Sequence, residues 1–363
     1  MMGAGAGKMP KVIVGMSGGV DSAVAAFLLK QAGYDVTGVT LRTWVASDGT
    51  EGRCCEIDDA RRVARELDIP YYAFNCISDF EDHVITPFIG AYISGQTPNP
   101  CIQCNRYVKW ERMLYYAKVM QADYVATGHY ASVVKLENGR YTVKKALHTE
   151  KDQSYMLCKL SQEQLAATLM PLGNLSKQEV RTIAEQAHIP VAAKRDSQEI
   201  CFVPDGDYAG YIEANADACL AGEGFFVDGK GNRLGKHKGI TRYTVGQRKG
   251  LGLALGYPVY VQGIRPETNE VIVGDEQSLY RSNIVCGELN FMSISELGIG
   301  ERLSCRVKVR YHHFPQEAVI EAVGQDRVRI SFVSPVRAPA PGQSAVFYDQ
   351  NDCVIGGGII LET

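Results

Sequence analysis

The sequence KVIVGMSGGVDS, residues 11–22, decides the fold class of this chain. Its first six residues form a short β-branched run that predicts a buried strand, and the segment after it has the pattern of a helix that ends at Gly33. Gly18 and Gly19 let the backbone approach a ligand closely, and the neighbouring serines offer hydroxyl groups. The start of the helix adds unpaired N–H groups and a positive dipole end. The stretch therefore predicts a loop that binds a phosphate group.

Outward from this loop, strand-like and helical segments alternate. Further β-branched runs lie at residues 34–42, 70–76 and 122–130, with amphipathic segments between them. This alternation predicts an α/β fold in which helices cover a parallel sheet. Such sheets bind ligands beyond the carboxyl ends of their strands, which is where the loop would lie.

The rest of the chain has a different pattern. Residues 132–147 predict a hairpin around Asn138-Gly139, and residues 222–274 are rich in glycine with short β-like runs. Beyond Asn283 the chain has short alternating strands, including residues 302–311. These patterns predict a small β-rich middle domain and a C-terminal β-barrel or sandwich. We expect domains at residues 1–206, 207–282 and 283–363.

Length and composition exclude several classes of protein. The 363 residues suffice for two or three domains, and 22% charged with 45% hydrophobic residues is an ordinary globular composition. The net charge of −3 does not indicate a particular class of binding partner. No apolar run approaches the ~20 residues that span a bilayer, and the first residues lack a secretory pattern, so we expect a cytoplasmic protein with no membrane partner. Eleven cysteines are too dilute for a disulfide framework.

The glycine loop matches neither common nucleotide-binding motif. It lacks the G-K-[ST] ending of the P-loop and the three-glycine spacing of the dinucleotide fingerprint. Residues 17–22 instead resemble the SGGxDS loop of the PP-loop ATP pyrophosphatases. This resemblance implies ATP cleavage between the α and β phosphates, with adenylation of a substrate oxygen. Asp21 would orient Mg²⁺ or cap the helix, and the sequence leaves both roles open.

Three cysteines stand in segments that suggest chemistry. Cys101 and Cys104 lie in GQTPNPCIQCNRYVKW, where the prolines favour a rigid loop that leads into a helix near Asn105. A helix start and nearby basic residues lower a thiol pKa, so a reactive thiolate is plausible there. Structural zinc is the alternative, but it needs four ligands, and the adjacent pair Cys54-Cys55 suits one tetrahedral ion poorly. Cys201, taken alone, has the surroundings of a buried small apolar residue.

Several motifs together resemble the tRNA-specific 2-thiouridylases, the bacterial family called MnmA. They are PNPCIQCN (98–105), ATGHYA (126–131), KDQSYML (151–157), RDSQEICFVP (195–204) and TVGQRKGLG (244–252). The resemblance covers nearly the whole chain, including its three-part layout. It implies a PP-loop domain, which adenylates O2 of uridine 34 in the tRNA anticodon before sulfur attacks C2 and AMP leaves.

The resemblance also implies roles for individual residues. Cys201 would carry sulfur as a persulfide, Cys104 would act as the nucleophile, and Asp21 and Cys101 would complete the catalytic set. ATP would contact Gly15, Met16, Ser17, Gly18, Gly19, Val20, Asp21, Ser22, Leu41 and Gly128. The target base would lie against Asn99, Pro100 and Cys101. Contacts with tRNA would come from His129, Lys151, Asp152, Gln153, Arg310, Tyr311 and Gln343.

Cys101 departs from the better-known family pattern, which has an aspartate at this position. A carboxylate there could handle protons. With a third thiol in its place, Cys101, Cys104 and Cys201 could instead ligate a 4Fe-4S cluster with one iron open to sulfide. The persulfide relay and the cluster remain alternatives at this point.

Basic residues gather late in the chain. Residues 229–266 hold eight lysines and arginines and no acidic residue, which favours contact with RNA phosphates. Arg306, Lys308 and Arg310 alternate along one predicted strand and would share a face, with Tyr311 placed to stack on an unpaired base.

The family implies partners as well. These are tRNA, in bacteria the isoacceptors for Lys, Glu and Gln, and a sulfur donor such as a cysteine desulfurase or a sulfur-relay protein. Two rival hypotheses remain. Another PP-loop synthetase or amidotransferase would not need the cysteines, and a zinc-stabilised RNA-binding protein without catalytic activity would not release pyrophosphate.

Overall fold

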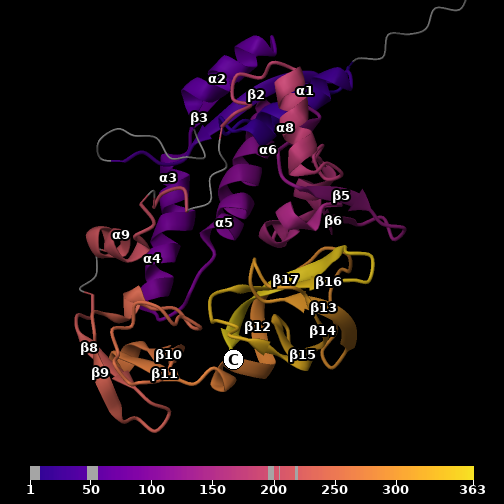
Figure 1. Ribbon diagram of the computed structural model, residues 1–363. Coiled ribbons are helices and arrows are strands. Elements are labelled where there is room, and N and C mark those ends of the chain that lie inside the picture. Colours follow the sequence, from indigo (N-terminus) through magenta and orange to yellow (C-terminus); the bar gives the residue numbers. More distant parts are fainter. Residues whose placement is uncertain (1–8, 47–55, 195–199, 204, 217–219) are drawn as a thin grey trace, which may run out of the picture. The chain divides into compact units, whose positions relative to one another are not determined.

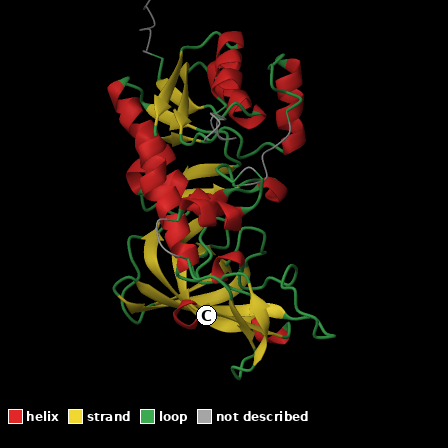
Figure 2. Ribbon diagram, turned by 90° about the vertical axis from the view of Figure 1, so that its left-hand side faces the viewer, coloured by secondary structure: helices red, strands yellow, loops and turns green. Residues whose placement is uncertain are grey.

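The computed structural model describes residues 9–46, 56–194, 200–203, 205–216 and 220–363. The chain divides into two compact units. Residues up to 81 together with 103–204 form the first unit, and residues 82–102 together with 205–363 form the second. Figure 1 labels elements of both units, and Figure 2 colours helices red and strands yellow. The first unit holds most of the helices and the second most of the strands.

A parallel sheet of five strands forms the centre of the first unit, in the order β3-β2-β1-β4-β7. The strands are β1 (Lys11–Gly15), β2 (Asp35–Arg42), β3 (Tyr71–Asn75), β4 (Tyr124–Ala126) and β7 (Thr168–Leu169). Val12 and Val14 of β1 are fully buried in a hydrophobic cluster shared with the helices of this unit. The prediction of a parallel α/β sheet is confirmed. Its order reverses at β1 and β4, and ligands of such sheets bind at that point.

Helices follow most strands of this unit. They are α1 (Val20–Gln31), α2 (Ile57–Glu66), α3 (Ile77–Phe80), α6 (Glu111–Val119), α7 (Gln162–Ala166) and α8 (Lys177–Gln186), with the 3₁₀ turns η3 (Thr149–Lys151) and η4 (Ser154–Leu157). Gly33 has a φ of +85° directly after α1, so the predicted end of this helix is confirmed. Ser176 and Glu179 form a capping box that fixes the start of α8.

The predicted hairpin is also confirmed. It consists of β5 (Ala131–Lys135) and β6 (Tyr141–Lys145), which pair in antiparallel register. Gly139 turns the chain with a φ of +82°, a value that glycine reaches without strain.

The helix expected near Asn105 begins earlier, so that prediction was wrong. α5 (Pro100–Gln103) is followed directly by the π-helix η2 (Cys104–Trp110) and then by α6. Proline at the first helical position needs no N–H partner, so Pro100 marks the start of a helix, whereas Pro98 lies in the loop before it. Cys101 and Cys104 therefore both lie on helical turns.

The second unit contains a small sheet and a barrel. Its helices are α4 (Thr86–Ile93), after the π-helix η1 (Glu81–Ile85), and α9 (Tyr208–Asn215). The small sheet has the order β10-β11-β8-β9, formed by β8 (Gly224–Val227), β9 (Arg233–His237), β10 (Tyr260–Arg265) and β11 (Glu270–Gly274). The 3₁₀ turns η5 (Ile240–Arg242), η6 (Pro266–Thr268) and η7 (Gln277–Leu279) connect its parts.

The C-terminal strands close into a barrel, in the order β12-β15-β14-β13-β16-β17. They are β12 (Tyr280–Phe291), β13 (Arg302–Lys308), β14 (Gln316–Gly324), β15 (Arg327–Arg337), β16 (Ser344–Tyr348) and β17 (Val354–Glu362). Cys305, Ile320 and Ile330 are fully buried in its interior cluster. Of the two architectures expected here, the structure has the barrel.

No helix among the described residues has the length and apolar character needed to cross a membrane. The domain boundaries near residues 206 and 282 stay predictions.

Candidate active site

The glycine loop lies between β1 and α1, as its sequence predicted. The backbone N–H of Ser17 donates to Ser22 Oγ (3.2 Å), and Ser22 Oγ donates to the carbonyl of Gly19 (3.1 Å). Gly18 has a φ of +78°, and a Cβ atom there would lie 2.7 Å from the carbonyl oxygen of Glu56. Gly18 therefore cannot be replaced without strain, which explains the first glycine of the motif.

Two neighbouring strands hold the loop in place. On β2, Thr40 Oγ1 donates to the carbonyl of Met16 (2.6 Å). Leu41, the next residue of this strand, is buried. After β4, Gly128 packs against the start of α1, because a Cβ atom at Gly128 would lie only 2.6 Å from the carbonyl carbon of Asp21. Both residues that the family resemblance assigned to adenosine contact thus lie in the same unit as the loop.

Asp21 stands in the first turn of α1 with its carboxylate fully engaged. It accepts a hydrogen bond from the hydroxyl of Tyr130 (2.7 Å) and forms an ion pair with Lys177 of α8 (2.8 Å). The N-cap position belongs to Gly19, so Asp21 is not the capping residue. The arrangement does not fit a ready Mg²⁺ site, because both acceptor oxygens already have donors.

A second lysine, Lys194, holds the other side of the loop. Its ammonium group donates to the carbonyl of Gly18 (3.2 Å) and pairs with Glu56 and Asp59. Burial opposes the charge on Lys194, but the hydrogen bonds and the negative charges of the two carboxylates outweigh it and raise the pKa. Lys194 therefore remains protonated beside the loop at neutral pH.

Sequence patterns did not identify either lysine. The capping box at Ser176 marks the start of a helix, but only the tertiary fold brings Lys177 to Asp21, 156 positions away. Lys194 directly precedes residues 195–199 of the predicted cysteine motif, and those residues lie outside the described part of the chain.

The three predicted cysteines differ in exposure. Cys101 is exposed, Cys104 is buried and Cys201 is intermediate. Asn99 Oδ1 accepts the backbone N–H of Cys101 (3.2 Å) at the start of α5. Phe202, beside Cys201, packs edge-on against Phe80 with ring centroids 5.6 Å apart.

Among the described residues, no group of three or more histidine, cysteine or acidic side chains could hold a metal ion. The iron–sulfur cluster and the zinc site that the sequence left open stay predictions, because Cys101 belongs to the second unit whereas Cys104 and Cys201 belong to the first. Cys54 and Cys55, the other candidate zinc ligands, lie outside the described residues.

Three other cysteines, Cys76, Cys158 and Cys305, are poor nucleophiles. Burial raises the pKa of Cys76 and of Cys158 to about 11, and burial together with Glu317 raises the pKa of Cys305 to about 12. These thiols stay protonated at neutral pH, and the protonated thiol is not the reactive form.

The segment that carries Asn99 to Cys101 is anchored within the second unit. Gln343 Nε2 donates to the carbonyl of Thr97 (2.8 Å), and the N–H of Thr97 donates to the carbonyl of Pro341 (2.8 Å). Gly342 between them has a φ of +88°, and a Cβ atom there would lie 2.9 Å from the Thr97 nitrogen. Gln343, expected to contact tRNA, thus lies directly beside the expected target-base segment.

The expected tRNA contacts of the first unit take part in local networks. His129 Nδ1 lies 2.8 Å from Thr127 Oγ1, and burial together with the positive Lys109 lowers the His129 pKa to about 3. Asp152 is buried, and it accepts hydrogen bonds from the N–H and hydroxyl of Ser154.

Two more residues of this group lie beside them. Gln153 pairs with Tyr130 through its backbone N–H and its side-chain oxygen, each at 2.9 Å. Lys151 is partly exposed at the end of η3. Gln153 therefore supports the Tyr130 that binds Asp21.

Arg310 and Tyr311 lie beyond the end of β13, so the basic residues do not form the simple strand face that was predicted. Arg310 Nε donates to the carbonyl of Ala338 (3.0 Å), and its Nη2 donates to the carbonyl of Val245 (2.7 Å). Arg306 pairs with Asp352 (3.0 Å), and Lys308 is buried with its ammonium 5.3 Å from the centre of the Tyr311 ring. The strand ends too early to carry all three cations on one face.

The basic stretch 229–266 is partly neutralised by acids outside it or at its edge. Lys236 pairs with Glu223 (3.1 Å), Arg265 pairs with Glu270 (3.3 Å), and Arg242 pairs with Glu213. The sequence could not show this, because these acids are distant in sequence or lie just beyond the stretch. The remaining cations leave the region basic.

Comparison with known proteins gives the family. Residues 10–205 match a model described as a tRNA methyl transferase HUP domain, residues 217–275 a tRNA methyl transferase PRC-barrel domain, and residues 281–360 an aminomethyltransferase beta-barrel domain. A curated tRNA-specific 2-thiouridylase MnmA of Lachnoclostridium phytofermentans is 51% identical over 361 residues, which are 98% of this chain and all of the relative. The chain belongs to the MnmA family.

Other MnmA relatives agree over the same length. The MnmA of Acetivibrio thermocellus is 51% identical over 96% of this chain and 99% of its own, and that of Clostridioides difficile is 49% identical over 96% and 98%. Among solved structures, the U34-tRNA thiolase NcsA of Methanococcus maripaludis with its 4Fe-4S cluster has a TM-score of 0.36 at 20% identity, over 57% of this chain and 67% of its own. That likeness is too weak to bear on the cysteines of this MnmA family member.

Proposed function

We propose that this chain catalyses the ATP-dependent 2-thiolation of uridine 34, the wobble base of the tRNA anticodon. The observation that carries the proposal is the similarity to curated 2-thiouridylases along the whole chain. The position of the SGGVDS loop supports the proposal. The loop follows the carboxyl end of β1, the central strand of a parallel sheet, and ligands of such sheets bind beyond the carboxyl ends of the strands.

In the first step, O2 of the uridine attacks the α phosphorus of ATP, and pyrophosphate leaves. The residues proposed to hold ATP are those of the loop, Gly15 to Ser22, with Leu41 and Gly128. The free N–H groups and the dipole of α1 favour the negative charge that develops on the phosphates. Adenylation turns O2 into a good leaving group, because it departs from C2 as AMP.

In the second step, sulfur replaces the activated oxygen. The terminal sulfur of a persulfide on Cys201 attacks C2 and displaces AMP, and the Cys104 thiolate then attacks the Cys201 sulfur. This releases the thiocarbonyl and leaves a Cys104–Cys201 disulfide, which an external thiol must reduce before the next cycle. We propose the persulfide relay rather than a cluster, because Cys104 and Cys201 both belong to the first unit together with the SGGVDS loop.

Asn99, Pro100 and Cys101 are proposed to contact the target base, which must leave the anticodon stack to be modified. The proposed tRNA contacts are His129, Lys151, Asp152, Gln153, Arg310, Tyr311 and Gln343. The proposed substrates are the tRNAs for Lys, Glu and Gln, and the proposed partner is a cysteine desulfurase or a sulfur-relay protein.

The test is a single-turnover thiolation assay with tRNA, ATP and a persulfide donor, without thiol reductant. We expect about one 2-thiouridine per enzyme and one new disulfide by mass spectrometry. Cys104→Ser and Cys201→Ser should lose thiolation, whereas Cys158→Ala, at a buried thiol with a raised pKa, should keep it.

Two results would contradict the proposal. ATP-dependent release of pyrophosphate without formation of 2-thiouridine, unchanged in Cys104→Ser and Cys201→Ser, would favour a synthetase that needs no cysteine. About four irons per chain after anaerobic preparation, lost together with activity in Cys101→Ser, would show that a cluster carries the sulfur.

A further inference from the structure

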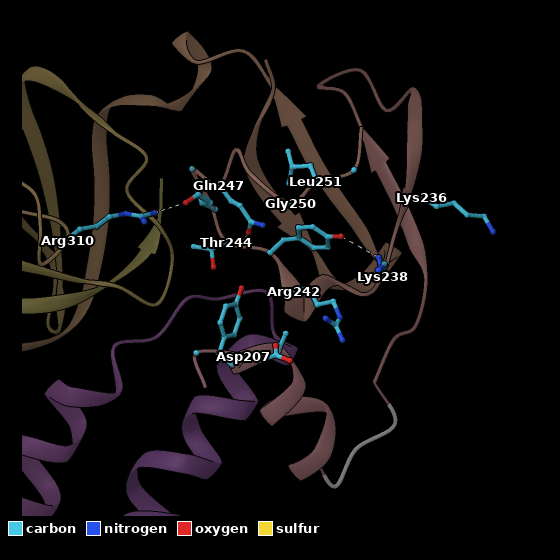
Figure 3. Close-up of a pocket in the computed structure, with 16 residues that line it drawn as sticks. Asp207, Lys236, Lys238, Arg242, Thr244, Gln247, Gly250, Leu251 and Arg310 are labelled. Atoms are coloured by element: carbon cyan, nitrogen blue, oxygen red, sulfur yellow. Dashed lines mark hydrogen bonds between the residues drawn. The ribbon is translucent and has the colours of Figure 1, made fainter. Parts of the chain in front are cut away.

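The second unit contains a pocket that is lined in part by the basic stretch 229–266 and by Arg310. Its volume is about 930 Å³, which lies within the ~300–1,000 Å³ of ligand pockets. The wall comes from the loop before α9, the end of β9, the segments around residues 242–247 and 250–252, and Arg310 (Figure 3).

The lining of this pocket is positively charged. Lys236, Lys238, Arg242 and Arg310 line it, and Asp207 is the one acidic residue among the described lining residues. Asp207 is already engaged, since its Oδ1 accepts the N–H of Gly210 (3.0 Å) as the N-cap of α9. The pocket therefore favours an anion.

Lys238 is the cation best placed to bind that anion. Its side chain is exposed, and its backbone N–H donates to the hydroxyl of Tyr243 (3.5 Å), which fixes the position of the residue at the pocket wall (Figure 3). In contrast, Lys236 pairs with Glu223 and points away from the pocket in Figure 3, and both arginines already bind protein groups. No acidic side chain of the described residues forms an ion pair with Lys238.

Neutral hydroxyl groups complete the wall. Tyr208 and Thr244 line the pocket, and their side chains share a hydrogen bond. Tyr92 is not a lining residue, but its ring centroid lies 4.9 Å from that of Tyr208, and its hydroxyl also shares a hydrogen bond with Thr244. Burial raises the pKa of both tyrosines, so they stay protonated and can donate hydrogen bonds. Gly250 and Gly252 form part of the rim with φ values of +77° and +69°, and the absence of their side chains leaves room for a chain to approach.

We propose that this pocket binds a phosphodiester of the RNA backbone and that Lys238 is its phosphate-binding residue. A compact cation beside hydroxyl donors, in an open cavity whose lining has four cations and one carboxylate, suits a phosphate and the sugar attached to it. The segment of residues 97–101, anchored by Gln343, belongs to the same compact unit. The inference rests on the proposed function, because that function supplies tRNA as the source of the phosphate.

The experiment measures tRNA binding to the full chain by fluorescence anisotropy across a range of salt concentrations, with no ATP or sulfur donor present. Lys238→Gln should weaken binding and make the plot of log affinity against log salt shallower by about one. The matched control is Lys118→Gln, which removes the same charge from an exposed lysine of α6, outside the pocket and outside the basic stretch 229–266. Thermal unfolding verifies that both variants fold.

The outcomes are distinct. Equal affinity and equal salt slope for the two variants would overturn the proposal. Binding of free AMP or inorganic phosphate that depends on Lys238, while tRNA binding does not, would also overturn it and assign the pocket to a small phosphate ligand. Thiolation is assayed separately on the wild-type protein and tests the proposed function. Failure of the pocket proposal is therefore distinguished from failure of the proposed thiolation activity.

Discussion

His129 shows how the environment of a single residue changes its chemistry. Burial and the charge of Lys109 lower its pKa to about 3, so it is neutral at physiological pH and can offer RNA a hydrogen bond but no charge. The motif ATGHYA identified the residue, yet a histidine in a sequence gives no sign of its protonation state.

This shift has a consequence for acid stability. An unfolded histidine binds a proton below a pKa of about 6.5, whereas His129 in the folded chain does not until about pH 3. The unfolded state therefore binds more protons between these values, and stability falls as the pH falls through this window. His313, whose pKa burial and nearby cations lower to about 4, acts in the same direction.

We expect His129→Asn to make the loss of stability between pH 6.5 and 4 less steep, measured by urea unfolding at each pH. The control is His188→Asn, because His188 is exposed and its φ of +52° suits asparagine. An equal change of pH dependence in both variants would contradict the prediction.

At the scale of elements, the close contact between Gly128 and the start of α1 lets the loop after β4 pack directly against the phosphate loop. The motif marks Gly128 for adenosine contact, but the structure gives a second reason for glycine there. A side chain would collide with the backbone of Asp21 and Ser22 at 2.6 Å.

Gly128→Ala should therefore lower the free energy of unfolding by about 1–3 kcal/mol, because the two segments must move apart. It should also weaken ATP binding, measured by calorimetry. The same substitution at Gly90 in α4 is the control, since a Cβ atom there meets nothing within 4 Å. Gly90→Ala should raise stability by about 1 kcal/mol. Equal effects of the two substitutions would contradict the steric explanation.

Elements near the cysteines show a limit of sequence patterns. Prolines at 98 and 100 favoured a loop, but Pro100 begins a helix. A proline pattern indicates a boundary of a helix and does not say on which side of the proline the helix lies.

At the scale of the whole molecule, Arg310 joins the middle segment to the barrel within the second unit. Its two hydrogen bonds reach the carbonyls of Val245 and Ala338, which are 93 positions apart in the sequence. The strand pattern of the sequence does not predict that one side chain joins these two segments. Family resemblance proposes it as a tRNA contact, and the structure adds this structural role.

We expect Arg310→Lys to keep the charge but to lose one of the two bonds, because an ammonium group lacks the planar fork of a guanidinium. Stability should fall by about 1–3 kcal/mol, and hydrogen exchange should rise at Val245 and Ala338. Arg248→Lys, at an exposed arginine, is the control and should change neither. Unchanged exchange in Arg310→Lys would mean that the residue does not hold the two segments together.

The sequence alone determined the parallel sheet, the phosphate loop, the hairpin and the family, because strand period, glycine placement and short motifs are local properties of the chain. It also marked the three cysteines and Gln343 by resemblance. Only the tertiary structure brought Lys177 to Asp21, Lys194 to Gly18, and Glu213 to Arg242. These are pairings between charges that are distant in sequence, and such pairs leave no periodic signal. The same holds for the pocket beside Lys238, since a cavity is defined by where separate segments stop rather than by the composition of any one of them.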